Sequence, residues 1–131
     1  MPTELHLLGA TLLLALAQIF LAGSARTRQY GRAWNASARD ELMPPLDPLP
    51  ARLQRAQANL FETLPLFIGA LLAVMVANRL GTKTLIGAHL YFWGRLVYVP
   101  LYAAGIPYVR TIVWAIATAG LLLIIAALMI D

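Results

Sequence analysis

The chain alternates between long apolar stretches and shorter polar connections. Four mostly apolar stretches of about 18 residues or more are long enough to cross a bilayer as helices. We predict membrane helices over about 5–25, 51–78, 84–104 and 108–130. The pattern therefore predicts an all-α fold: an integral membrane four-helix bundle in which residues 1–131 form a single transmembrane domain.

The connections between these stretches have different compositions. The segment from about residue 26 to 50 is polar, rich in arginine, and closes with four prolines around Asp47. Prolines at this density cannot continue a helix, so we expect a structured loop. Pro65 predicts a kink inside the second helix, of a kind that neighbouring helices tolerate. Gly81 marks the next turn, and Gly105-Ile106-Pro107 is expected to form a tight last connection.

The distribution of basic residues predicts an orientation in the membrane. Six of the ten basic residues lie in or beside the first connection: Arg26, Arg28, Arg32, Arg39, Arg52 and Arg55. The second connection holds only Arg79 and Lys83, and Arg95 and Arg110 flank the third. By the positive-inside rule, the first connection is expected to be cytoplasmic and both termini extracytoplasmic.

Composition narrows the possible classes of function. Of the 131 residues, 60% are hydrophobic and 12% are charged, which excludes a soluble globular protein. The net charge of +4 comes from residues between apolar segments, so we expect no nucleic-acid partner. Because the chain has no cysteine, it has neither a disulfide nor a thiolate nucleophile, and its two distant histidines predict no metal site.

One face of the second predicted helix carries three polar side chains. Arg55, Asn59 and Glu62 are spaced i, i+4 and i+7, so they project from the same face. A charged residue at mid-bilayer costs roughly 2.5–3.5 kcal/mol, so these side chains should face the bundle interior. We therefore expect Glu62 and Arg95 to be partners. These polar residues could form a ligand site, and the alternative is that Glu62 and Arg95 form a purely structural ion pair.

The third predicted helix carries a second polar stripe. Arg95, Tyr98 and Tyr102 are spaced i, i+3 and i+7, and Tyr91 extends the stripe toward the membrane centre. Arg110 opens the fourth helix on the same side. With the arginines that end the first helix, these residues bring more positive than negative charge to one level of the membrane. Such a surplus favours an anionic ligand, and a peptide-like acid suits the nearby hydroxyl, amide and carboxylate groups better than inorganic phosphate.

Two runs of sequence carry these stripes, Arg52-Leu-Gln-Arg55-Ala-Gln57-Ala-Asn59-Leu-Phe-Glu62-Thr63-Leu-Pro65 and Gly94-Arg95-Leu-Val-Tyr98-Val-Pro-Leu-Tyr102, the latter followed by Arg110. Their combination resembles the pattern of the MAPEG family, the membrane-associated proteins of eicosanoid and glutathione metabolism. The resemblance covers essentially the whole chain. It implies a four-helix protomer, a homotrimer, and glutathione bound in a U shape between neighbouring subunits near the cytoplasmic side.

The resemblance also implies a role for each polar position. Arg110 matches the arginine beside the glutathione sulfur in catalytic members, where a fixed cation lowers the thiol pKa below its usual value of about 8.5. Thr27 stands where some members have a second arginine, and other members have histidine at the position of Tyr98, which weakens the case for a prostaglandin-type activity. The implied glutathione-binding residues are Arg26, Arg55, Gln57, Asn59, Glu62, Arg95, Tyr98 and Tyr102, with Gln57 reaching across the subunit boundary.

The expected function is that of a membrane-bound glutathione transferase or peroxidase. Glutathione would be the co-substrate, and the second substrate would be a lipophilic electrophile or a lipid hydroperoxide that arrives from the surrounding membrane lipids. The alternative is a non-catalytic lipid-binding or scaffold protein of the same fold, because the family contains a member that presents lipid to a partner enzyme. A small transporter is disfavoured, since neither broken helices nor repeat symmetry mark a permeation path.

Overall fold

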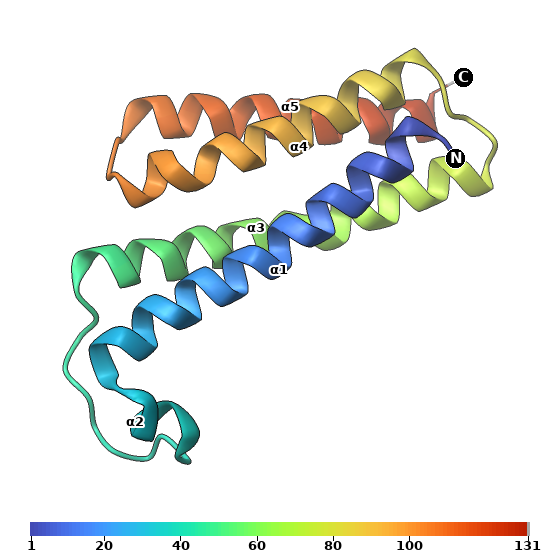
Figure 1. Ribbon diagram of the computed structural model, residues 1–131. Helices are drawn as coiled ribbons and strands as arrows, with labels where there is room; N and C mark the ends of the chain where they lie inside the picture. Colours follow the sequence, from blue (N-terminus) through green and yellow to red (C-terminus); the bar gives the residue numbers. More distant parts are fainter. Residues whose placement is uncertain (131) are drawn as a thin grey trace.

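The computed structural model describes residues 1–130, which form five helices and no strand. Figure 1 shows α4 and α5 side by side, with α1 and α3 as their neighbours, and the start of α1 at the same end of the molecule as the end of α5. The all-α prediction is confirmed. The helices are α1 (Thr3–Tyr30), α2 (Arg32–Ala36), α3 (Pro48–Val76), α4 (Thr82–Ala103) and α5 (Tyr108–Met129).

The first helix is longer than the apolar pattern predicts. We expected it to end near residue 25, but α1 continues to Tyr30 because nothing before Gly31 interrupts it. Gly31 has a φ of 98°, a conformation that residues with a side chain rarely adopt, and it separates α1 from α2. Part of the predicted loop is therefore helical. The three other long helices begin and end within one turn of their predicted bounds.

The segment between α2 and α3 folds back on the end of α1. The Gln29 side chain accepts a hydrogen bond from the backbone N–H of Asp47 (2.7 Å) and donates one to the carbonyl of Pro45 (3.2 Å). The Tyr30 hydroxyl donates to the carbonyl of Pro44. These bonds hold the proline-rich segment against α1, so that α3 begins beside the helix that precedes it.

Small residues allow α4 and α5 to approach closely, and this pair makes the most extensive helix contact in the molecule. A Cβ atom on Gly87 would lie 2.5 Å from the carbonyl oxygen of Gly120, and one on Gly120 would lie 2.6 Å from that of Gly87. Further along, a Cβ on Gly94 would lie 2.9 Å from the Cβ of Ala117. Membrane helices associate through such stripes because lipid offers no hydrophobic gain for their packing.

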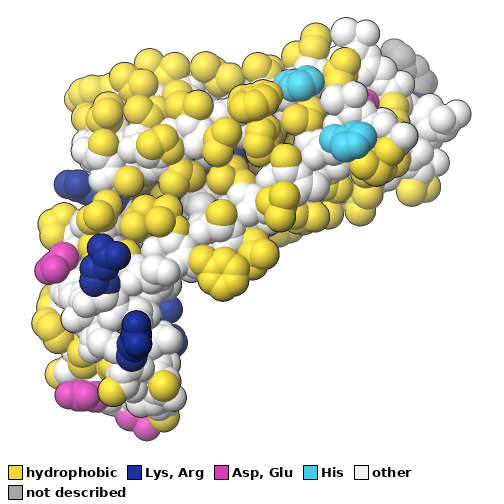
Figure 2. Space-filling model, in the orientation of Figure 1, with side chains coloured by type: hydrophobic (Ala, Val, Ile, Leu, Met, Phe, Trp, Pro, Cys, Tyr) yellow, Lys and Arg dark blue, Asp and Glu magenta, His cyan; other side chains and the backbone are white. Residues whose placement is uncertain are grey.

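Three helices, α1, α3 and α5, are long and apolar enough to cross a membrane. The sequence pattern led us to expect four. The helix outside this group is α4, whose apolar residues are interrupted by His89, Arg95 and three tyrosines. Much of the apolar surface of the long helices faces outward, and Figure 2 shows hydrophobic side chains over them, with several Lys and Arg side chains near the α2 end. The chain is therefore an integral membrane protein by its helices and by its surface.

A buried carboxylate ties the start of α1 to the start of α4. Glu4 is only 6% exposed, and its Oε2 accepts a hydrogen bond from the Thr84 hydroxyl (2.8 Å). The same hydroxyl oxygen accepts the backbone N–H of Gly81 (2.9 Å), at the N-cap of α4. This contact holds α1 and α4 together at the end of the molecule opposite α2.

Candidate functional site

Five side chains form an arginine–tyrosine cluster between α3, α4 and the first turn of α5: Arg55, Arg95, Tyr98, Tyr102 and Arg110. Arginines and tyrosines alternate along it. The Arg95 guanidinium lies 4.4 Å from the centre of the Tyr98 ring, and Arg110 Nη1 donates to the Tyr98 hydroxyl (3.1 Å). Arg110 also lies 4.6 Å from the Tyr102 ring, whose hydroxyl accepts a hydrogen bond from Arg55 Nε (3.1 Å). The cluster thus fixes three cations with two aromatic rings.

The turn between α4 and α5 brings Arg110 to the end of the tyrosine stripe. Gly105 in this turn has a φ of 73°, and a Cβ there would lie 2.9 Å from the Arg52 guanidinium carbon. Arg52 Nη1 also donates to the carbonyl of Ala103 (3.4 Å). The sequence interpretation gave Arg52 no role in the site, although its position three residues before Arg55 places it near the same face of α3. Arg52 holds the turn that positions Arg110.

Arg95 lies at the buried end of the cluster. It is 1% exposed, and its Nη1 donates to Asn59 Oδ1 at 2.8 Å. Its Nε and Nη2 are buried and have no hydrogen-bond partner among residues 1–130. A buried guanidinium with unpaired N–H groups is costly, since it has lost its water without regaining equivalent bonds. This end of the cluster therefore has unused capacity to bind an anion or another hydrogen-bond acceptor.

The prediction that Glu62 and Arg95 are each other's partners is wrong for the direct contact: within residues 1–130 Arg95 is hydrogen-bonded to Asn59 and forms no ion pair with Glu62. Asn59 takes the hydrogen bond, whereas Glu62 is exposed and interacts with Arg95 only at longer range, as an opposite charge. The reason is rotation about the helix axis. Successive residues turn by about 100°, so Glu62 points about 60° further from the bundle interior than Asn59 does. Shared spacing put both residues on one face but did not decide which one reaches α4.

Three residues of the predicted binding set are neither in the cluster nor hydrogen-bonded to it, whereas Asn59 joins it through Arg95. Glu62 is exposed on α3, Gln57 is half-buried on the same helix, and Arg26 lies over the Trp34 ring at 5.8 Å, at the α1–α2 end. Within residues 1–130, none of the three forms a hydrogen bond with a cluster residue. One protomer therefore assembles six of the nine predicted site residues: Arg55, Asn59, Arg95, Tyr98, Tyr102 and Arg110.

Two polar side chains near the bundle interior were missed by the sequence interpretation. Thr63 is within hydrogen-bond distance of the Tyr91 hydroxyl (2.8 Å), which extends the polar stripe of α4 to α3. Gln18 is 4% exposed, and neither its amide nitrogen nor its oxygen has a hydrogen-bond partner among residues 1–130. The signal for Gln18 was available, since it is spaced three and four residues from Ala15 and Ala22 on the buried stripe of α1.

The chemical capacity of the site is that of a cationic cluster that also carries hydroxyl groups. Arg55, Arg95 and Arg110 supply three positive charges, and no carboxylate in residues 1–130 is hydrogen-bonded to any of them. In the same described part of the chain, no group of three or more His, Asp or Glu side chains could hold a metal ion. The arrangement is suited to hold a polyanionic organic ligand and to stabilise a developing negative charge.

The fold and the cluster define the class of protein: a small helical integral membrane protein with polar side chains between its helices. The MAPEG family model matches residues 7–130, nearly the whole chain. No curated protein and no solved structure matches it. The chain belongs to the MAPEG family, which includes glutathione transferases as well as related membrane proteins that are not enzymes.

Proposed function

We propose that the chain is a membrane-bound glutathione transferase that acts on a lipophilic electrophile or a lipid hydroperoxide. The observation that carries the proposal is Arg95, a buried guanidinium with two unpaired nitrogens, in a cluster with two further arginines. Family membership supports glutathione over other anions, because the family includes glutathione transferases. Among such anions, glutathione has two carboxylates to match two of the three cations.

The two ends of glutathione bind at different depths. Arg55 is exposed and Arg95 is buried, so each arginine takes one carboxylate in a charge-assisted, bidentate contact. The Asn59 side-chain oxygen accepts the hydrogen bond from Arg95, so its amide NH₂ group is free to donate to a peptide group of glutathione. Glu62, which has no hydrogen-bonded partner in residues 1–130, pairs with the ammonium group of the ligand.

The two tyrosines complete the binding wall. Each hydroxyl accepts a hydrogen bond from an arginine, Tyr98 from Arg110 and Tyr102 from Arg55, so its own hydrogen remains free to donate to the ligand. A hydroxyl polarised by a cationic donor is a stronger donor than a free one. Tyr98 and Tyr102 therefore stabilise negative charge on glutathione.

Arg110 stabilises the thiolate. Its guanidinium is held by Tyr98 and Tyr102, so its charge is fixed before the thiol ionises. In conjugation, the thiolate attacks the electrophilic carbon, a carbon–sulfur bond forms, and the leaving group departs with its electron pair. With a hydroperoxide, the thiolate attacks the outer oxygen, and the O–O bond breaks to give a sulfenic acid and an alkoxide, which takes up the proton that the thiol released. A second glutathione then converts the sulfenic acid to glutathione disulfide and water.

A homotrimer completes the site. Arg26 and Gln57 lie away from the cluster of their own protomer, and Glu62 and Arg55 are exposed on α3. Placing α3 against a neighbouring subunit would bury these charges and bring Arg26 and Gln57 to the neighbour's cluster. Native mass spectrometry in mild detergent should detect a three-subunit species. A strictly monomeric protein that binds glutathione would contradict this assembly.

The cluster opens toward the cytoplasm. Most arginines lie at the α2 end and at the α4–α5 turn, so this end faces the cytoplasm and both termini face outward. Cysteines placed at Ala36 and at Thr82, at opposite ends of the molecule and both exposed, should react oppositely with an impermeant thiol reagent added outside cells. Labelling of position 36 from outside would mean that this end of the molecule faces away from the cytoplasm, where cytoplasmic glutathione could not reach the site.

A non-catalytic lipid-binding or scaffold protein is the second candidate. The observation that favours it is that Arg110 already has a hydrogen bond and two ring contacts, which suffice for a structural role. The family also contains members that are not enzymes. The two candidates differ in whether Arg110 changes the ionisation of a bound thiol.

The deciding experiment combines binding with ionisation. Calorimetric titration of the detergent-purified protein with glutathione measures affinity, and ultraviolet difference absorbance measures the bound thiolate. Arg110→Ala should leave the Kd within a few-fold while turnover with an aromatic electrophile falls about 10²-fold, the scale of losing one preorganised electrostatic group. Equal thiolate absorbance and equal turnover in both proteins would make Arg110 structural and favour the scaffold.

A further inference from the structure

The turn between α4 and α5 leaves one carbonyl of α4 for a side chain to bind. The backbone N–H of Gly105 donates to the carbonyl of Tyr102 (3.0 Å), and that of Ile106 donates to the carbonyl of Leu101 (3.1 Å). With the left-handed φ of Gly105 (73°), these two bonds form a common helix-ending motif. Within residues 1–130, no backbone N–H donates to the carbonyl of Ala103, the last residue of α4.

Arg52 supplies the missing hydrogen bond from α3. The residue four positions after Ala103 is Pro107, which has no N–H to donate. Arg52 Nη1 donates to the Ala103 carbonyl instead (3.4 Å), and this is the one hydrogen bond of its guanidinium within residues 1–130. A cation at this place is favourable, because the C-terminal end of a helix is the negative end of its dipole. Arg52 therefore caps α4 from another helix.

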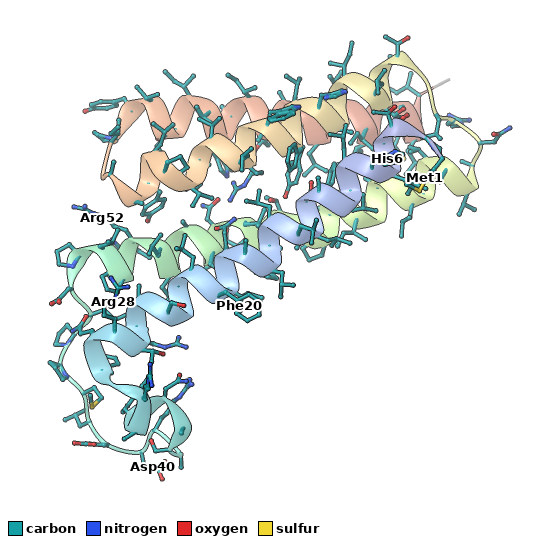
Figure 3. The ribbon with its side chains drawn as sticks, viewed as in Figure 1. Met1, His6, Phe20, Arg28, Asp40 and Arg52 are labelled. Carbon is teal, nitrogen blue, oxygen red and sulfur yellow. The ribbon has the colours of Figure 1, made fainter. Side chains whose placement is uncertain are left out.

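The Arg52 guanidinium lies flat against Gly105. Figure 3 shows the Arg52 side chain between the start of α3 and the turn that joins α4 to α5. A Cβ atom on Gly105 would lie 2.9 Å from Arg52 Cζ, 3.1 Å from Nη2 and 3.2 Å from Nη1. Because the central carbon is nearest and the two nitrogens are almost equally distant, this Cβ would lie over the flat face of the guanidinium. A lysine at position 52 would keep the charge but has no flat group to pack here.

Few other contacts hold the turn in place. Residues 104–109 are all exposed, so the turn has little packing of its own. The closest approaches between α4 and α5 are at Gly87 and Gly94, away from the turn. A segment with few buried contacts shifts easily unless a specific contact fixes it. The contact of Arg52 with Ala103 and Gly105 is of this kind.

The position of Arg110 depends on the geometry of this turn. Arg110 belongs to the first turn of α5, whereas the groups that hold its guanidinium, the Tyr98 hydroxyl (3.1 Å) and the Tyr102 ring (4.6 Å), belong to α4. A shift of the turn therefore moves Arg110 relative to both tyrosines. Within residues 1–130, Arg52 forms no hydrogen bond with any of these three side chains. Any influence of Arg52 on Arg110 through contacts must pass through the backbone of the turn.

We propose that Arg52 is a positioning residue for catalysis, which fixes the α4–α5 turn so that Arg110 lies where it stabilises the thiolate of glutathione. This inference rests on the proposed transferase function. Arg52 touches neither substrate, so its loss impairs ionisation of the bound thiol and leaves the affinity for glutathione unchanged. A displacement of about 1 Å at a reacting group costs up to about 10²-fold in rate, so a contact remote from the thiol has a measurable effect.

The test compares Arg52→Gln, Arg52→Lys and Gly105→Ala with the wild type in mild detergent. Turnover of an aromatic electrophile, the Kd for glutathione and the pH dependence of bound-thiolate absorbance are measured for each protein. Each variant should lower kcat about tenfold and raise the pH of half-ionisation by about one unit, with the Kd within a few-fold of the wild type. Lys83→Gln removes an exposed cation at the opposite end of the molecule and should change none of these values.

A double-mutant cycle separates action through Arg110 from a direct effect of the Arg52 charge on the thiol. If Arg52 acts through Arg110, then Arg52→Gln should cause no further loss of turnover in an Arg110→Ala background. A direct electrostatic effect predicts additive losses and a wild-type rate for Arg52→Lys. Either result would overturn the positioning role. A raised Kd with unchanged kcat would also overturn it and would make Arg52 a binding residue.

The same measurements distinguish failure of this inference from failure of the transferase proposal. If Arg110→Ala keeps wild-type turnover and thiolate absorbance, the transferase proposal fails and takes the role of Arg52 with it. If Arg110→Ala loses both while the three variants at positions 52 and 105 keep them, only the role of Arg52 is overturned. The Tm of each variant identifies any that does not fold, and the remaining variants then decide the outcome.

Discussion

Helix α4 packs against α5 and α3 by opposite means. Its contact with α5 is made by Gly87 and Gly94, where a Cβ atom would clash with the partner helix. Its contact with α3 is made by Tyr91 and Arg95, whose polar atoms meet Thr63 and Asn59. The first contact depends on shape alone, and the second on hydrogen-bonding groups buried in an apolar bundle.

The two contacts are expected to contribute differently to stability and to ligand binding. Close packing of small residues stabilises a membrane helix pair without polar groups. A buried ionic or polar contact is often no more stable than well-packed apolar residues of the same size, because its groups must lose water. We therefore expect that the α4–α5 face sets the stability of the bundle, and that the α3–α4 face is polar because a ligand binds there.

The largest effect on stability is expected at the contact between α4 and α5, where Gly87 and Gly120 meet. Gly120→Leu should lower the free energy of unfolding by about 3 kcal/mol or more, because the new side chain meets the Gly87 carbonyl and forces α4 and α5 apart. Thermal unfolding of the detergent-purified protein measures the change. Ala119→Leu, at an exposed position on the same helix, is the control and should leave Tm nearly unchanged. Equal Tm values for the two variants would show that close helix approach does not limit stability.

A double substitution at the α3–α4 contact should separate the effect on stability from the effect on glutathione binding. Asn59→Leu alone should cost about 2 kcal/mol, since it leaves the Arg95 guanidinium buried without its remaining hydrogen bond. Asn59→Leu with Arg95→Met should recover most of that stability, because an apolar pair replaces a polar one. Chemical unfolding and glutathione calorimetry on the same samples provide the test. Stability that stays low in the double variant would mean that this polar contact is structural.

An exposed residue of the cluster should affect binding without affecting stability. Arg55→Ala should raise the Kd for glutathione about tenfold, or about 1.4 kcal/mol, because one carboxylate loses its partner. Its Tm should not change, since Arg55 is exposed and its main contact is the Tyr102 hydroxyl. Gln54→Ala, the exposed neighbour on α3, is the control for both measurements. An unchanged Kd would remove Arg55 from the binding site.

The smallest effect on stability is expected at the contact between the Thr63 and Tyr91 hydroxyls of α3 and α4. Thr63→Val should cost about 1 kcal/mol, because it leaves the Tyr91 hydroxyl without its partner. Tyr91→Phe should cost less, because the Thr63 hydroxyl still donates to the carbonyl of Leu60 (3.3 Å). The double variant should be no less stable than Thr63→Val alone, since it also removes the Tyr91 hydroxyl. Unfolding midpoints of the three variants give the coupling energy of the pair. Strictly additive losses would mean that the two hydroxyls do not interact.

The sequence by itself determined the four long helices, the polar stripes and the family. Apolar length and helical periodicity are local properties, so the stripe of Arg95, Tyr98 and Tyr102 could be read from spacing alone. The proximity of Arg110 to this stripe followed from the short turn between α4 and α5. The end of α1 was misplaced, because the apolar run stops before the helix does and only Gly31 ends it.

Only the tertiary structure decided which polar groups meet. Asn59 and Glu62 share a helix face but differ by about 60° around the helix axis, and it is Asn59 that lies within hydrogen-bond distance of Arg95. The same is true of Gly87 and Gly120, which stand far apart in sequence and whose close contact depends on how α4 crosses α5. Periodicity determines the direction of a side chain relative to its own helix. The rotation and separation of two helices depend on all the side chains between them, so partners across an interface are a property of the packed bundle.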